Sequence, residues 1–265
     1  MAKPKWRSIL VYYVLACAIS WPFFWWKDVH SESWALSAIP EWIRFMGLMW
    51  GPGIAALLCF VLFRSAHQRT ITLLGTSKIR SVCFCIVPIL FLPFVHPPAG
   101  RLLFGVVQNP ETRQLTPLLF VSVMLLSLCW ALGEELGWRG FLQDALRPIS
   151  LAPRFVLLGI LWAFWHFTNF TANRPLKVGA ITLAISYLAI ILMTFIIGLA
   201  VERSHSLSVA VTIHMWVDLA IHLRTERTSI LFAGSILFWI MLLWNWPQDS
   251  KSTSHESQCS YQPLL

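Results

Sequence analysis

Eight apolar runs, separated by shorter polar segments, follow one another along this 265-residue chain. A helix needs about 20 mostly apolar residues to cross the hydrocarbon core of a bilayer. The pattern therefore predicts an all-α, polytopic membrane protein with about eight transmembrane helices. We place these helices at residues 8–26, 42–63, 82–95, 118–132, 155–170, 178–201, 207–223 and 230–246.

The runs leave no span over for a second unit, so residues 1–246 are expected to form a single membrane domain. Residues 247–265 are polar and are expected to be a disordered tail. The first run has basic residues before it, as a signal sequence does, but it continues to Trp26 and is longer than the apolar part of a signal sequence. It is therefore predicted to be an uncleaved first helix.

Composition supports a membrane protein. The chain is 57% hydrophobic and only 12% charged, whereas about a quarter of the residues in soluble domains are charged. The net charge of +8 comes from Lys and Arg between apolar runs, where they set topology and contact anionic lipid. We expect a lipid bilayer as partner and no nucleic acid. With the N-terminus in the cytoplasm, the larger share of the basic residues falls on the inner side, so both termini are expected to be cytoplasmic.

The fourth run continues into a charged motif. Glu134 and Glu135 follow directly after apolar residues, and helical spacing of large apolar side chains persists as far as Leu146. We therefore expect one long or bent helix over 117–146 with both glutamates inside the bundle. Gly133 and Gly137, four residues apart, would let a neighbouring helix approach closely. The alternative places both glutamates at a helix end in the lipid headgroup zone.

Within this motif, Glu135 and Arg139 are four residues apart and are predicted to pair along one helix face. Glu134 points about 100° away, because a helix has about 3.6 residues per turn, and it is left free. A carboxylate in a poorly solvated site suits a general base that acts on water.

Two later helices carry further polar residues at depth. His166 is expected about 16 Å into the fifth helix and His214 about 10 Å into the seventh, so both would share a layer in the cytoplasmic half. Asp218 follows His214 by four residues and could orient its ring. His166 alone also fits a hydrogen-bonded packing residue. Together with Glu134, these side chains predict one convergent site.

Three motifs in order resemble those of the CAAX prenyl protease and bacteriocin-processing (CPBP, or Abi) family of intramembrane proteases. They are Glu134-Glu135-x-x-x-Arg139, the aromatic-x-x-x-His of Trp162–His166, and the His-x-x-x-Asp of His214–Asp218. The resemblance implies an eight-helix membrane endopeptidase with its protease core at 117–223.

By the same resemblance, Glu134 activates water and His166 helps to hold or activate that water. His214 and Asp218 stabilise the oxyanion, and Glu135 and Arg139 support the site. The chain departs from the family at two positions. Trp162 stands where the family commonly has Phe, and we expect this exchange of one aromatic residue for another to be tolerated. Asp218 replaces a common Asn, and an ionised Asp cannot donate to an oxyanion, so it must be protonated, orient His214 or bind a metal.

Cofactor and function are left with alternatives. Either no cofactor is required, or a divalent metal such as zinc is bound by Glu134, His166, His214 and Asp218. The expected partner is a peptide or protein substrate, prenylated or membrane-anchored. A non-catalytic binding or immunity protein could use the same pocket. A proton-coupled transporter also places such residues at depth, but no inverted repeat favours it.

Overall fold

Helices form nearly all of the part of the chain that the computed structural model describes, namely residues 4–29, 46–63, 70–95, 117–167, 180–223 and 226–246. Their bounds are α1 (Trp6–Val29), α4 (Gly51–Leu62), α5 (Lys78–Val95), α7 (Pro117–Gly137), the π-helix η2 (Trp138–Gln143), α8 (Leu151–Trp165), α10 (Ala180–Ser204), α11 (Leu207–Leu223) and α12 (Glu226–Trp244). Each predicted apolar run overlaps one of the α-helices. The all-α expectation is thus confirmed for the described ranges.

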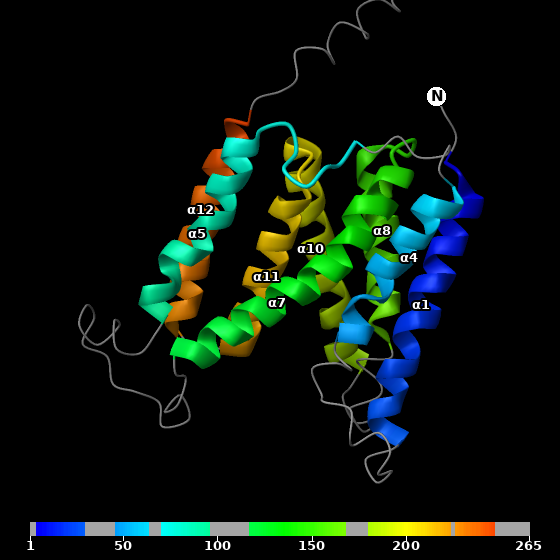
Figure 1. Ribbon diagram of the computed structural model, residues 1–265, viewed down its shortest axis with the longest axis horizontal. Coiled ribbons are helices and arrows are strands. Elements are labelled where there is room, and N and C mark those ends of the chain that lie inside the picture. Colours follow the sequence, from blue (N-terminus) through cyan, green and yellow to red (C-terminus); the bar gives the residue numbers. More distant parts are fainter. Residues whose placement is uncertain are drawn as a thin grey trace, which may run out of the picture.

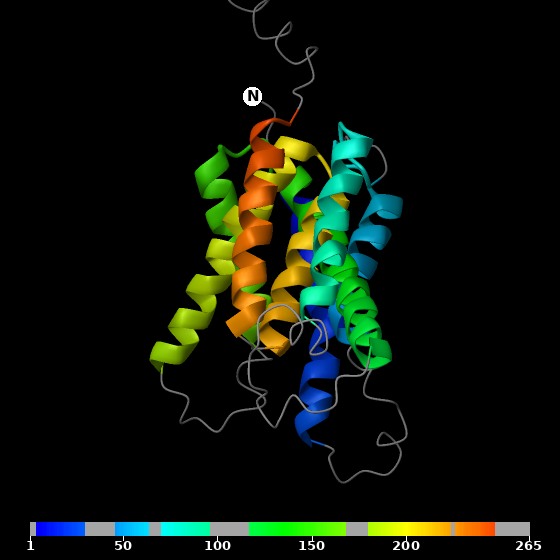
Figure 2. The same ribbon diagram turned by 90° about the vertical axis from the view of Figure 1, so that its left-hand side faces the viewer.

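The helices stand side by side, and α7 runs obliquely across the bundle (Figure 1). α5 and α12 pack together at one edge, and α1 lies at the other edge, packed on α4 (Figure 1 and Figure 2). α8 packs on α10, and α7 contacts both α4 and α11. Because of its central position, α7 can present side chains to neighbours on opposite sides.

Two glycines on α7 allow the beginning of α4 to approach closely. A Cβ atom at Gly133 would lie 2.8 Å from the ring of Trp50 and 2.9 Å from the main-chain oxygen of Met49. A Cβ atom at Gly137 would lie 2.5 Å from the Cβ atom of Pro52. The expectation that this glycine pair admits a neighbouring helix is confirmed, and the neighbour is α4.

α7 does not end at its glutamates but continues directly into η2. Glu134 is 3% exposed and Glu135 is 0% exposed. The prediction of one continuous helical segment with both carboxylates inside the bundle is confirmed, and the alternative placement in a solvated headgroup zone is wrong. Single π-helical turns inside α-helices are frequent at functional sites.

α8 differs from its predicted bounds. It begins at Leu151 rather than at residue 155, because Pro153 falls in the first turn, where its missing N–H costs no intrahelical hydrogen bond. It ends at Trp165, so His166 is the C-cap residue and not an interior helical residue. Residues 168–170, the first residues of the run at 42–63, and the predicted tail at 247–265 lie outside the described residues.

Pairing between two loops fixes where α11 begins. The N–H of Thr72 donates to the main-chain oxygen of His205 at 3.0 Å, and the N–H of Leu207 donates to that of Thr72 at 2.8 Å. His205 has φ 53°, in the left-handed region, at the junction of α10 and α11. This junction sets the height of His214, which lies two turns further along α11.

By length and composition, α1 over Trp6–Phe23 and α10 over Leu183–Ser204 could cross a membrane. Other apolar helices of the described residues, such as α4 and α8, are shorter. About eight spans therefore remains a prediction. The outward face of α10 carries exposed large apolar side chains at helical spacing, namely Ile185, Leu188, Leu192, Ile196 and Leu199.

Candidate active site

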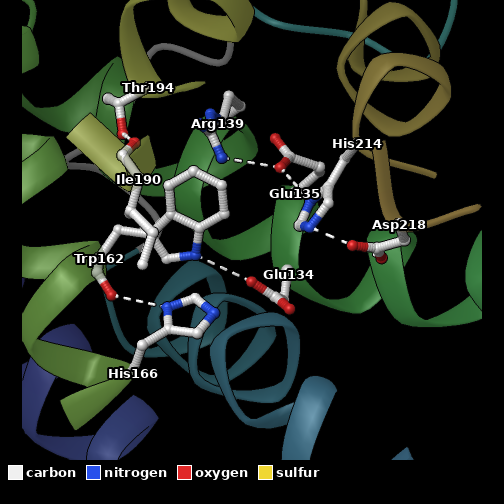
Figure 3. A network of polar contacts seen from close by, with 9 residues as sticks. All are labelled: Glu134, Glu135, Arg139, Trp162, His166, Ile190, Thr194, His214 and Asp218. Atoms are coloured by element: carbon white, nitrogen blue, oxygen red, sulfur yellow. Dashed lines mark hydrogen bonds and ion pairs between the residues drawn. The ribbon is translucent and has the colours of Figure 1, made fainter. Parts of the chain in front are cut away.

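Glu134 is held by an indole from the neighbouring helix. Nε1 of Trp162, on α8, donates a hydrogen bond of 2.9 Å to Oε2 of Glu134 (Figure 3). Both residues are only 3% exposed. Hydrogen bonds to charged groups are stronger than those between neutral groups, and losing one in the interior leaves a buried charge uncompensated. The carboxylate that the sequence left free is thus fixed by Trp162.

Glu135 points to a different side of α7 and connects it to α11. Its Oε1 atom accepts hydrogen bonds from Nη1 of Arg139 and from Nδ1 of His214, both at 2.7 Å. The pairing of Glu135 with Arg139 that the spacing predicted is confirmed. The bond to His214 was not predicted. Glu135 therefore bridges the first and third motifs, with Arg139 as a fully buried counter-ion.

His214 lies between two carboxylates. Besides its bond to Glu135, its Nε2 atom lies 3.8 Å from Oδ2 of Asp218, one turn further along α11. The predicted pairing of His214 with Asp218 is confirmed at this distance. Asp218 has a side chain that is 25% exposed, whereas that of Glu135 is 0% exposed. One ring nitrogen is therefore fixed in the interior, and the other faces the more open side of the site.

His166 is oriented by the main chain of the preceding turn. Its N–H and its Nδ1 atom both lie within hydrogen-bond distance of the main-chain oxygen of Trp162, at 3.2 and 2.9 Å. A carbonyl oxygen can only accept, so Nδ1 must carry the proton. In the neutral ring, Nε2 then bears the lone pair and is able to accept a proton. The bond agrees with the packing interpretation and with the catalytic one.

The predicted residues converge around one side chain. The ring centroid of Trp162 lies 5.7 Å from that of His166 and 5.4 Å from that of His214, and its nitrogen binds Glu134. Sequence reasoning treated Trp162 only as an aromatic exchange. The signal that could have found it is the indole N–H, a polar group in an apolar run that must find an acceptor when buried.

A second polar network ties η2 and α8 to α10. Nε2 of Gln143 donates to Oε1 of Glu202 at 2.9 Å and to the main-chain oxygen of Gly198 at 3.1 Å. Arg154, near the start of α8, donates to the same Glu202 oxygen at 3.2 Å. Because α8 carries Trp162 and His166, this network holds the helix that completes the site.

The arrangement does not fit a zinc centre. Within the described ranges, no three His, Cys, Asp or Glu side chains form a group that could hold a metal ion. We therefore derive no catalytic step that involves a metal.

Comparison with known proteins agrees with the motifs. Residues 116–220 match the family model described as type II CAAX prenyl endopeptidase Rce1-like. A protein of Methanococcus maripaludis named CAAX prenyl protease 2 is 33% identical over 130 residues, which cover 46% of this chain and 48% of that protein. The chain thus spans about half the length of this relative in the alignment. The expected family resemblance is confirmed over the segment that contains α7, η2, α8, α10 and most of α11.

Proposed function

We propose, from the match of residues 116–220 to the Rce1-like family model, that this protein is an intramembrane endopeptidase of the CAAX prenyl protease type. It would hydrolyse a peptide bond in a membrane-associated substrate. The observation that carries the proposal is the gathering of Glu134, His166 and His214, from three helices, around the buried Trp162. This set supplies a general base, an acceptor for a hydrogen bond from the water and a group able to stabilise an oxyanion.

In the first step, Glu134 takes a proton from a water molecule that also donates to Nε2 of His166. The resulting hydroxide attacks the carbonyl carbon of the peptide bond. General-base assistance of this kind contributes about 10²–10⁴-fold to a rate. The proton then passes from Glu134 to the leaving nitrogen as the C–N bond breaks, so the products are a carboxylic acid and an amine, which ionise to carboxylate and ammonium, and the glutamate is regenerated.

His214 acts as an imidazolium between the carboxylates of Glu135 and Asp218, and its N–H at Nε2 stabilises the negative charge that develops on the carbonyl oxygen. Glu135 and Arg139 keep its ring in place from the interior, and Asp218 orients it from the open side. Preorganised donors at an oxyanion are worth about 10²–10³-fold in kcat. In this proposal Asp218 acts through His214. It therefore need not donate a hydrogen bond to the oxyanion, and an Asp can serve at a position where the family commonly has Asn.

The exposed apolar face of α10 supports a location in the bilayer, because soluble proteins seldom expose so continuous an apolar surface. In our proposal the protein is multi-pass with both termini in the cytoplasm. The substrate is a peptide or protein tail, prenylated or otherwise membrane-anchored. Such a lipid group would bring the scissile bond to a site enclosed by helices.

The test uses the full chain reconstituted in liposomes and a farnesylated CAAX peptide, with cleavage products identified by mass spectrometry. The expected result is cleavage by the wild type and none by the Glu134→Ala/His166→Ala double variant. The same peptide without the farnesyl group tests the substrate class. A wild type that cleaves neither peptide would contradict the proposal, and equal cleavage of both would contradict the preference for prenylated tails.

A further inference from the structure

Trp162 contacts every group to which the proposed chemistry assigns a role near the water. Its indole nitrogen binds Glu134, its ring makes T-shaped contacts with the rings of His166 and His214, and its main-chain oxygen accepts from Nδ1 of His166. These contacts come from one residue that is 3% exposed. A buried indole N–H needs an acceptor, and here that acceptor is the carboxylate of the proposed base.

The bond to Glu134 selects one orientation of the carboxylate. An indole has one N–H and can make one directed donation, here to Oε2 of Glu134 at 2.9 Å. With Oε2 engaged, rotation of the carboxylate is restrained, and Oε1, which does not take part in this bond, is the oxygen to which we assign the proton. Misplacement of a reacting group by about 1 Å can cost about 100-fold in rate.

The indole is itself held from its other side. The guanidinium carbon of Arg139 lies 4.4 Å from the ring centroid of Trp162, in a cation–π arrangement. Arg139 is in turn fixed by its ion pair with Glu135, which binds His214. The orientation of Trp162 is thus coupled to the side chains that hold the oxyanion-stabilising histidine.

We propose that Trp162 is a positioning residue for hydrolysis, which orients the carboxylate of Glu134 through its indole N–H. This inference rests on the proposed function. It assigns Trp162 no contact with the reacting atoms. Loss of the Trp162 N–H is therefore expected to lower kcat rather than to raise KM, because the orientation of the base matters after the substrate has bound.

The sharpest test deletes the N–H and keeps the shape. Benzothienylalanine at position 162, introduced by an expanded genetic code, replaces the N–H of the indole by sulfur. We expect kcat to fall about 10–100-fold with KM within about twofold of the wild type. Trp162→Phe, which also lacks the donor, is expected to lose at least as much. If Trp162 served only in packing, the benzothienylalanine protein would be as active as the wild type. That result would overturn the proposal.

Trp239 provides a matched control on α12. It is a buried tryptophan whose Nε1 donates to the main-chain oxygen of Phe84 at 3.2 Å, away from the site. The same benzothienylalanine replacement there removes one buried indole hydrogen bond. We expect kcat to stay within about twofold of the wild type. An equal loss of kcat at both positions would show that the effect is structural and would overturn the proposal.

A second readout does not depend on activity. In protein labelled with ¹⁵N-tryptophan, the indole signal of Trp162, assigned through its absence in Trp162→Phe, is expected to move when Glu134 is replaced by Ala, while that of Trp239 stays in place. An unmoved Trp162 signal would overturn the proposal. If the wild type cleaves no peptide, the proposed function fails, while this signal still decides whether Trp162 holds Glu134.

Discussion

Glu135 and His214 lie 79 positions apart in the sequence, yet they share a hydrogen bond of 2.7 Å in the interior of the bundle. The same carboxylate oxygen is the partner of Arg139. A single acidic side chain therefore neutralises a buried guanidinium and orients the imidazole that, in our proposal, stabilises the oxyanion. Glu135 is therefore expected to contribute both to the stability of the fold and to catalysis.

Replacing Glu135 by Ala is expected to destabilise the fold. Breaking a buried ion pair from one side costs about 3–5 kcal/mol, because the remaining charge is left without compensation. The loss should appear as a lower midpoint of thermal unfolding in detergent. Arg147→Gln is the control. It removes the ion pair with Asp144 and the contact with Nδ1 of His205 from a side chain that is 28% exposed, while Asp144 keeps its hydrogen bonds from Thr70, so about 1 kcal/mol or less is expected. Equal decreases in the unfolding midpoint of the two variants would contradict the larger contribution that we assign to the buried pair.

His166 is expected to contribute through Nε2 rather than through its cap position. His166→Asn places an amide N–H near the position of Nδ1 and can keep the bond to the main-chain oxygen of Trp162, but it offers nothing in place of Nε2. We expect this variant to fold with cleavage reduced about 100-fold or more. Wild-type activity in a folded His166→Asn protein would instead support the packing interpretation.

Asp218→Asn is expected to retain cleavage within about tenfold of the wild type, because an amide can orient His214 and can also donate to an oxyanion. Asp218→Ala removes both possibilities and should lower kcat about 100-fold. The comparison is made in the same liposome assay with matched amounts of folded protein. Full loss in the Asn variant would show that the charge of Asp218 is required, and would contradict the orienting role.

The close approach of α4 to α7 predicts a sharp contrast between two glycines. A Cβ atom at Gly137 would lie 2.5 Å from Pro52, whereas one at Gly140 would meet no atom closer than 3.5 Å. Gly137→Ala should therefore cost about 1–3 kcal/mol through overpacking, and Gly140→Ala much less. Unfolding midpoints of the two variants measure this. Equal midpoints would indicate that α4 can move aside without cost.

Local rules predicted much of this architecture. Helical spacing placed Glu135 beside Arg139, and a glycine pair on α7 indicated a close helix neighbour. The bond from Glu135 to His214 lay beyond those rules, since it depends on how two helices distant in sequence are rotated against each other. The bond from Trp162 to Glu134 was missed for the same reason. The end of α8 was misplaced because the apolar run continues past Trp165, the last residue of α8.

The measurement that tests the account most directly is the single-turnover cleavage rate of Glu134→Gln with the farnesylated peptide. Glutamine has nearly the same shape and keeps an oxygen for the indole of Trp162, but it cannot take a proton from water. The account predicts peptide binding within about threefold of the wild type and cleavage slower by about 10³-fold. Cleavage within tenfold of the wild-type rate would contradict the role of Glu134 as the base.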